Sequence, residues 1–284
     1  MKKIYMDIVK QNMLMTKELL DVTKILEENG IKSIAFKGPT LSQLAYGDVV
    51  SRQYVDLDIL IEEKYLFHAA KILNKNSYNS DKPIELLQNK KYIMSDNDYS
   101  FFTLNNIHIE LHWKLFREKI AKQIDIYNHN FSNAEVTINT KSIKTLSLEI
   151  MIVYLCLHGS KHLWERIEWI LDIDKLISSQ DEKIDWYKVF ELATEMNCKI
   201  SLFLGLNLSR IFFNTSFNED INKLLKNKLT INLTKEIIAF ISKKLLLEED
   251  YKKYQDVNLF QLKLKKKKKE KLNHLIATYF SITK

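Results

Sequence analysis

Two aspartates stand one residue apart at the start of an apolar, β-type run. Asp56 and Asp58 lead into Ile59, Leu60 and Ile61, and residues i and i+2 of a strand point to the same face of a sheet. The two carboxylates therefore project side by side, where they repel each other unless a cation lies between them. Mg²⁺ takes oxygen ligands and bridges to substrate phosphates. The alternative is a strand that begins in solvated turn acids, and the strongly apolar run after Asp58 favours the metal.

A third carboxylate lies on another strand-like segment. Residues 107–113 alternate between apolar and polar types, so that His108, Glu110 and His112 share one face. If this strand lies beside the strand of the aspartates, Glu110 joins them at one site. Three acids around two divalent cations suit nucleotidyl transfer, because one cation activates the attacking hydroxyl and the other neutralises the leaving pyrophosphate. We therefore expect the three acids to be catalytic and to hold two Mg²⁺ ions, with Mn²⁺ as a substitute.

Zinc is the competing interpretation of the same segment. His108, Glu110 and His112 recur at i, i+2 and i+4, and His158 and His162 at i and i+4 on a predicted helix. Either set could ligate zinc. The helical pair encloses Gly-Ser-Lys, without the glutamate that serves as base in zinc proteases. This favours Mg²⁺ over a zinc hydrolase.

A strand-to-helix turn precedes the aspartates. Lys37 and Gly38 follow a short apolar run, and Pro39 and Thr40 open a predicted helix. Glycine permits close backbone approach, and a helix N-terminus offers free N–H groups to phosphate. Lys37 can add a charge and Thr40 a hydroxyl. The alternative is a glycine that only makes the turn, which would be favoured if the acids were absent.

The elements that must position these residues change in kind along the chain. Up to about residue 145 the patterns predict alternating helices and strands, and beyond it only helices. We therefore expect an α+β fold, with a small mixed β-sheet and flanking helices in residues 1–144 and an all-α domain in residues 145–284. In the first part we expect a helix over 7–29, a strand over 34–36, a helix over 38–46, a strand over 58–61, a helix over 63–74 and a hairpin of 100–104 with 107–115. In the second we expect helices over 146–157, 163–177, 186–196, 200–213 and 233–247.

Composition agrees with a globular chain rich in long helices. The 284 residues include only five glycines and two prolines, which argues against an all-β architecture. Cys156 and Cys198 lie in apolar helical surroundings, as buried thiols do in a reducing compartment. The N-terminus lacks the apolar core of a signal peptide, and no stretch is long and apolar enough to span a bilayer. We expect a cytoplasmic protein without a membrane partner.

The net charge of +7 is concentrated near the C-terminus. Residues 263–271 hold seven lysines and one glutamate, which leaves +1 for the rest of the chain. Such a run could touch nucleic acid or acidic lipid. A solvated helix face or tail is the favoured interpretation, because no aromatic side chains are interleaved for base stacking.

These residues together resemble the DNA-polymerase-β-type nucleotidyltransferase superfamily, which has a glycine-containing strand-to-helix turn, Asp-x-Asp on the next strand and a third carboxylate later. The closer resemblance, over roughly residues 20–215, is to the uncharacterised nucleotidyltransferase family (NTP_transf_5). A Lys-Gly pair replaces the Gly-Gly or Gly-Ser of the wider superfamily, as it does in that family. The motifs that carry the resemblance are Phe36-Lys37-Gly38, Arg52 with Asp56-Leu57-Asp58, Ile109-Glu110-Leu111-His112-Trp113, and the His158-Gly159-Ser160-Lys161-His162 block with Trp169 and Asp172.

The resemblance implies Mg²⁺-dependent transfer of an NMP from an NTP, expected to be ATP, to a hydroxyl or phosphate of a small-molecule or macromolecular acceptor. A non-catalytic nucleotide sensor or a toxin–antitoxin component on the same fold is the alternative. The residues expected to hold the triphosphate are Lys37, Gly38, Thr40 and Arg52. The residues expected to bind substrate are His112, His158, Lys161, His162 and Asp172. Interhelical hydrogen bonds are the alternative role for the two histidines of the helical block.

Overall fold

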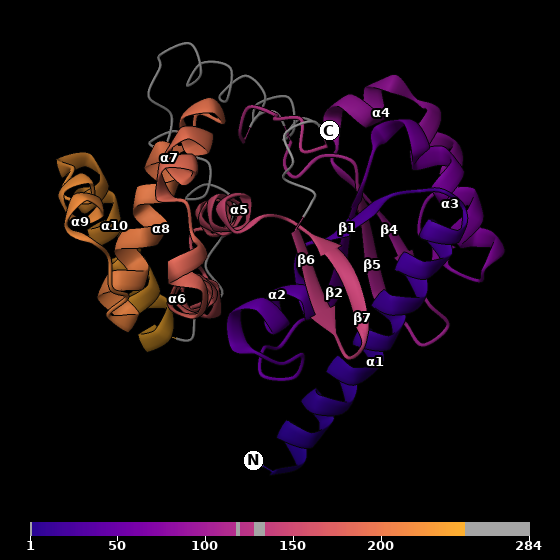
Figure 1. The fold of residues 1–284 in the computed structure, drawn as a ribbon, viewed down its shortest axis with the longest axis horizontal. Coiled ribbons are helices and arrows are strands. Elements are labelled where there is room, and N and C mark those ends of the chain that lie inside the picture. The colour runs from indigo at the N-terminus through magenta and orange to yellow at the C-terminus, as the bar shows by residue number, and fades with distance from the viewer. Residues whose placement is uncertain (1, 118–119, 128–133, 248–284) are drawn as a thin grey trace. The chain divides into compact units, whose positions relative to one another are not determined.

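The computed structural model describes residues 2–117, 120–127 and 134–247 (Figure 1). The chain divides into two compact units, the first comprising Met1–Arg117 and Asp125–Leu148 and the second Glu118–Ile124 and Glu149–Lys284. The lysine-rich run over 263–271 lies outside the described residues. None of the described helices combines the length and apolar character that crossing a bilayer would require.

The first unit is built on a mixed five-stranded sheet in the order β1-β2-β5-β4-β3. Strands β2 and β5 are parallel, and the other neighbours are antiparallel. A separate hairpin, β6 with β7, packs beside β1 and α2. The strands are β1 (Ser33–Ala35), β2 (Asp56–Ile61), β3 (Asn79–Ser80), β4 (Asp98–Phe102), β5 (His108–His112), β6 (Ala134–Ile138) and β7 (Lys141–Thr145). The helices are α1 (Lys2–Glu28), α2 (Gly38–Tyr46), α3 (Leu66–Lys75) and α4 (Lys90–Ser95), with 3₁₀ turns η1 (Glu63–Tyr65) and η2 (Ile84–Gln88).

Alternation along the strands separates an apolar face of this sheet from a polar one. Leu57, Ile59, Ile109 and Leu111 point into the core, where they meet apolar side chains of α1 and α3. Their neighbours at every second position carry the acids and histidines to the other face. Helix α1 runs along the sheet in Figure 1 and buries one apolar stripe against it. The core face thus fixes the register in which the polar face is displayed.

The predicted elements of this unit are present, with differences at their ends. The hairpin is confirmed as β4 with β5, and the predicted helix over 38–46 is α2 with the same bounds. Residues 78–94, which have no clear periodicity, form β3, η2 and α4. The β6–β7 hairpin has no counterpart among the predictions, because its strands are only five residues each and β7 is mostly polar.

The second unit is helical, as predicted, in its described part. Helix α5 is apolar around its whole circumference and is buried on all sides over most of its length. The helices are α5 (Leu148–Lys161), α6 (Glu168–Gln180), α7 (Trp186–Glu195), α8 (Lys199–Phe213), α9 (Glu219–Leu224) and α10 (Lys228–Leu247), with a 3₁₀ turn η3 (Asp181–Lys183). The prediction is wrong in omitting the short α9 and in starting the second helix at residue 163.

A tight corner explains why α6 begins late. Leu163 and Trp164 both adopt left-handed backbone angles, with φ of 57° and 54°, which costs energy in side chains other than glycine. Trp164 offsets that cost, because its indole is fully buried in a slot left open by Gly159 and Gly205. A Cβ at Gly159 would lie 2.3 Å from the indole ring. The two glycines are therefore where they are because the tryptophan needs their space.

We predict that Gly159→Ala destabilises the protein, although glycine-to-alanine changes in a helix normally stabilise it by about 1 kcal/mol. The added methyl group overlaps the Trp164 ring, and overpacking of this kind costs about 1–3 kcal/mol. Urea unfolding at an unchanged m-value measures the change. In a Trp164→Phe background the same substitution should cost less, because the smaller ring leaves room. A gain in stability from Gly159→Ala alone would contradict the conclusion that the Trp164 ring fills the space beside Gly159.

Candidate active site

The parallel pairing of β2 with β5 brings the three acids together. Asp56 lies opposite His108 and Asp58 lies opposite Glu110 in the ladder. Side chains of paired residues point to the same face of a sheet. The predicted adjacency of Glu110 to the two aspartates is therefore what the structure has, and it arises from the strand order.

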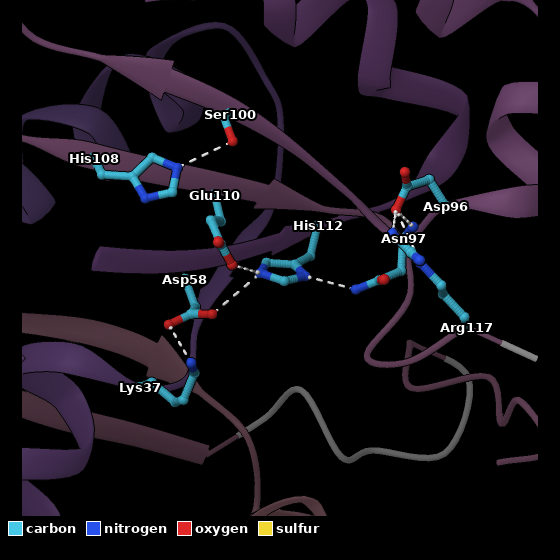
Figure 2. Close-up of polar contacts among 9 residues, drawn as sticks. All are labelled: Lys37, Asp58, Asp96, Asn97, Ser100, His108, Glu110, His112 and Arg117. Atoms are coloured by element: carbon cyan, nitrogen blue, oxygen red, sulfur yellow. Dashed lines mark hydrogen bonds and ion pairs between the residues drawn. The ribbon is translucent and has the colours of Figure 1, made fainter. Parts of the chain in front are cut away.

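Asp58 is the centre of the site and is only 2% exposed. Its Oδ2 lies 3.1 Å from Nζ of Lys37, and its Oδ1 lies 3.1 Å from Nε2 of His112 (Figure 2). The same Nε2 lies 3.3 Å from Oε2 of Glu110. A buried carboxylate is thus held between a lysine from the strand-to-helix turn and a histidine from β5, and the histidine is shared with a second carboxylate.

The ionisation of these groups follows from burial and from their partners. Burial favours a raised pKa of Asp58, but Lys37 and His112 outweigh it and hold that pKa well below its usual range. Burial likewise opposes charge on His112, but hydrogen bonds to Asp58 and Glu110 raise its pKa to about 9. Burial favours a raised pKa of Glu110 too, but the hydrogen bond to His112 and the charges of His112 and Lys37 together lower it. The pKa of Asp56 is raised, by burial first and then by Asp58.

The orientation of the His112 ring is fixed from its other side. The side-chain amide of Asn97 lies 3.3 Å from Nδ1 of His112, and the Phe36 ring meets the imidazole edge to face at a centroid distance of 5.1 Å. Asp96, the neighbour of Asn97, accepts hydrogen bonds from Nε and Nη2 of Arg117 at 3.1 and 2.6 Å. This polar chain, visible in Figure 2, leaves the imidazole one orientation.

Two residues of this surface have no place in the sequence-based prediction. Asn97 is one, and the other is Asp98, which lies opposite His112 in the β4–β5 ladder. Burial raises the pKa of Asp98, and the charge of Glu110 adds to the effect although His112 opposes it. The alternation of β4, which starts with Asp98, is the signal that could have placed this fourth carboxylate beside the others.

The Lys37–Gly38 turn has a steric reason for its glycine. Gly38 has φ +53°, and a Cβ there would lie 3.3 Å from the main-chain oxygen of Asp56, so the turn needs both the left-handed angle and the close approach. Thr40 is fully buried, and its hydroxyl donates to the carbonyls of Lys37 and Ala35 at 2.8 and 3.2 Å. The Thr40 side chain therefore closes the turn, and its hydroxyl is used in hydrogen bonds within the protein.

Arg52 stands on a loop that α1 holds in place. Nδ2 of Asn12, which is buried, donates to the carbonyls of Val49, Val50 and Arg52 at 3.3, 3.3 and 2.7 Å. The Tyr54 hydroxyl donates to the Val49 carbonyl at 2.9 Å. The Arg52 side chain is half-buried. A polar residue on a helix face, such as Asn12, gives no sequence signal that it will gather a loop 37 or more residues away.

The predicted substrate-binding block lies in the second unit. His158 and His162 approach each other and Trp169, with ring centroids 4.9 Å apart for the two histidines and 4.9 and 5.4 Å apart for each with the tryptophan. Both histidines and Lys161 are half-buried. Asp172, on α6, is fully buried. The structure thus groups the two histidines on a shared aromatic surface and places Asp172 in the interior.

Among the residues that the structure describes, two overlapping groups of side chains could hold metal ions. One comprises Asp56, His108 and Glu110, and the other comprises Asp58, Glu110 and His112; within each group the ligand atoms lie within 4.8 Å of one another. Glu110 belongs to both. Carboxylate oxygens are ligands that both Mg²⁺ and Mn²⁺ accept. The donor set therefore fits divalent-cation binding, and Glu110 is the residue that the two groups share.

The sequence matches the model of the uncharacterised nucleotidyltransferase family over residues 1–214. No curated protein matches it. Several solved structures are similar to it at low identity. Three of them are the lincosamide antibiotic adenylyltransferase LnuA with lincomycin bound (16% identity, TM-score 0.42, 57% of this chain and 96% of that one), the antibiotic-resistance factor ANT(2'')-Ia (12%, 0.43, 65% and 90%) and an antigenic nucleotidyltransferase-like protein from Paracoccidioides brasiliensis (16%, 0.39, 70% and 95%).

We predict that His112→Phe lowers the free energy of unfolding of the metal-free protein by about 3–5 kcal/mol, because it removes one partner of the buried Asp58 charge. Urea unfolding in the presence of a chelator measures the loss. In an Asp58→Asn background the same change should cost clearly less, since the buried charge is gone. Lys144→Met, which breaks the exposed pair with Glu135, is the control and should cost less than about 1 kcal/mol. Equal losses in the two backgrounds would contradict the pairing.

Proposed function

Since the chain belongs to the uncharacterised nucleotidyltransferase family and is by that membership a nucleotidyltransferase, we propose that it moves a nucleoside monophosphate from an NTP to a hydroxyl or phosphate of an acceptor in a Mg²⁺-dependent reaction. The observation that carries this proposal is the convergence of Asp56, Asp58 and Glu110 on one face of the sheet. ATP is the NTP we propose.

Asp56, Asp58 and Glu110 would hold two Mg²⁺ ions. When bound, such ions favour ionisation of an attacking hydroxyl and neutralise charge on a departing pyrophosphate. Asp58 is prepared for this role by its surroundings, because Lys37 and His112 keep it ionised although it is buried. The anionic centre is therefore already formed, and no reorganisation of the site is needed to create it.

The triphosphate would be held by the Lys37–Gly38 turn and by the loop that bears Arg52. Lys37 supplies a cation whose Nζ already lies 3.1 Å from Asp58, so a phosphate drawn to the lysine is drawn toward the acids. Gly38 allows the backbone to come close. Arg52, on the loop that Asn12 fixes, supplies a guanidinium that can bind phosphate oxygens in a fork.

In the transfer step, the acceptor oxygen forms a bond to the α-phosphorus of the NTP. The bond between that phosphorus and the oxygen that bridges to the β-phosphorus breaks, and pyrophosphate leaves with the electron pair. The proton of an acceptor hydroxyl passes to the carboxylate of Glu110, which is partly exposed and can release it to water. The products are the nucleotidylated acceptor, pyrophosphate and a proton.

We propose that the acceptor binds in the predicted all-α domain, residues 145–284. His158, Lys161 and His162 are its proposed contacts, because the imidazoles and the ammonium group are half-buried and grouped at the end of α5. Asp172, whose side chain on α6 is fully buried, would support these three residues from the protein interior. His112 belongs with the acids, since its Nε2 contacts two carboxylates. The buried, unbridged Cys156 and Cys198 agree with the cytoplasmic location that we propose.

We predict that Asp58→Asn lowers nucleotidyl transfer by about 10²- to 10⁴-fold, the equivalent of several kcal/mol of lost charge stabilisation. The assay mixes the full chain with Mg²⁺, an NTP labelled at the α-phosphate and a cell extract as the source of acceptor, and follows label bound to a new species. Asp21→Asn, at an exposed acid on α1, is the matched control and should transfer as the wild type does. Label transfer that survives Asp58→Asn unchanged, or no transfer by the wild type with any of the four NTPs, would refute the proposed reaction.

A further inference from the structure

Asp56 and Glu110 share their part of the acidic cluster with a histidine, His108, which is the first residue of β5. His108 is the direct neighbour of Asp56 in the β2–β5 ladder and lies two residues before Glu110 on the same face. A ring nitrogen of His108 and one carboxylate oxygen from each acid lie within 4.8 Å of one another. The three side chains are partly exposed, so an ion in solution can reach them.

The imidazole of His108 is oriented by its neighbours on β4. Its Nε2 lies 3.0 Å from Oγ of Ser100, and its ring stacks on Phe102 with an interplanar angle of 10° and a centroid distance of 4.8 Å. Ser100 lies on one side of the ring in Figure 2, and the ring nitrogen that it does not contact lies on the side of the strand that bears Asp58. Metal-binding histidines typically have a hydrogen-bond partner on the nitrogen away from the metal, and the Ser100 hydroxyl is such a partner for His108.

The corresponding histidine of the other group is placed differently. His112 is 4% exposed, and its Nε2 makes hydrogen bonds or ion pairs with Asp58 and Glu110. It therefore serves the carboxylates as a cationic partner. On β4, His108 contacts the Ser100 hydroxyl through Nε2 and the phenyl ring of Phe102 through its face, and one of its ring nitrogens lies within 4.8 Å of a carboxylate oxygen of Asp56. The two ends of the cluster are chemically unlike.

We infer that His108 ligates, through Nδ1, the divalent ion held by Asp56 and Glu110, and that this position takes a transition-metal ion such as Mn²⁺ in preference to Mg²⁺. Imidazole nitrogen suits first-row transition metals, whereas Mg²⁺ keeps to oxygen ligands. The inference rests on the proposed function for the existence of the metal position. It adds to that function a ligand and a metal preference that the three carboxylates alone would not give.

The test measures Mn²⁺ binding by the full chain with histidine labelled with ¹⁵N. Titration by electron paramagnetic resonance gives the Mn²⁺ affinity, pulsed resonance detects ¹⁵N coupled to the bound ion, and competition gives the Mg²⁺ affinity. We expect ¹⁵N coupling in the wild type. We expect His108→Asn to remove that coupling and to lower Mn²⁺ affinity by about 10- to 100-fold, as losses around metal ligands do, with much less effect on Mg²⁺. Ser100→Ala should weaken Mn²⁺ binding to a smaller extent.

Two further variants make the outcome specific to His108. His112→Asn should retain the ¹⁵N coupling, and His68→Asn, at an exposed histidine on α3, should match the wild type in every measurement. Coupling that persists in His108→Asn, or that disappears in His112→Asn instead, overturns the inference, as does an unchanged Mn²⁺ affinity in His108→Asn. Thermal unfolding confirms that each variant is folded.

The same samples separate this inference from the proposed function. Transfer of labelled nucleotide in Mg²⁺ is measured in parallel. Transfer by the wild type combined with an unchanged Mn²⁺ affinity in His108→Asn overturns the role of His108 and leaves the proposed reaction standing. Histidine-coupled Mn²⁺ in a wild type that transfers no nucleotide overturns the proposed reaction and leaves the role of His108 standing.

Discussion

A buried carboxylate in the middle of the sheet is the constraint on which the rest of this structure depends. Removing an ionised carboxylate from water costs several kcal/mol, and the cost is recovered only when cationic partners and hydrogen bonds surround it. Asp58 has such partners on both oxygens, Lys37 from the turn before α2 and His112 from β5. These partners are 21 residues before it and 54 residues after it in the chain. The fold must therefore join three separate segments before the charge can be buried.

Two of those segments, β2 and β5, are placed by apolar packing on the opposite face of the sheet. Leu57 and Ile59 flank Asp58, and Ile109 and Leu111 flank Glu110, and all four are completely buried. Sliding β5 by one residue against β2 would turn His112 into the core and an apolar side chain toward Asp58. The helices α1 and α3 that cover the apolar face thus stabilise the register of the acids, although they contribute none of them. Packing on one face and electrostatics on the other favour the same strand order.

Local patterns carried much of this information, and non-local contacts carried the rest. Strict alternation over 107–113 was enough to predict that Glu110 shares a face with two histidines, and the Lys-Gly turn was enough to predict α2. No local pattern could show that Asn97 orients His112 or that Asn12 gathers the loop bearing Arg52, because each contact joins segments that the fold brings together. Thr40 shows the opposite error, since its side chain looks available in sequence and is consumed by the turn itself. The late start of α6 likewise depends on Gly205, 41 residues after Trp164.

The distribution of charge within the cluster indicates where a metal ion is most needed. Lys37 and His112 both lie against Asp58, so the carboxylate that is deepest is also the one already compensated. Asp56 has its pKa raised by burial first and then by the charge of Asp58, which means that an ionised carboxylate is unfavourable at that position. A divalent cation between Asp56 and Glu110 would reverse this balance, because an opposite charge at close range favours ionisation more than partial burial opposes it. The fixed cations therefore stabilise the folded protein, and the remaining negative charge is left for a cation that can exchange.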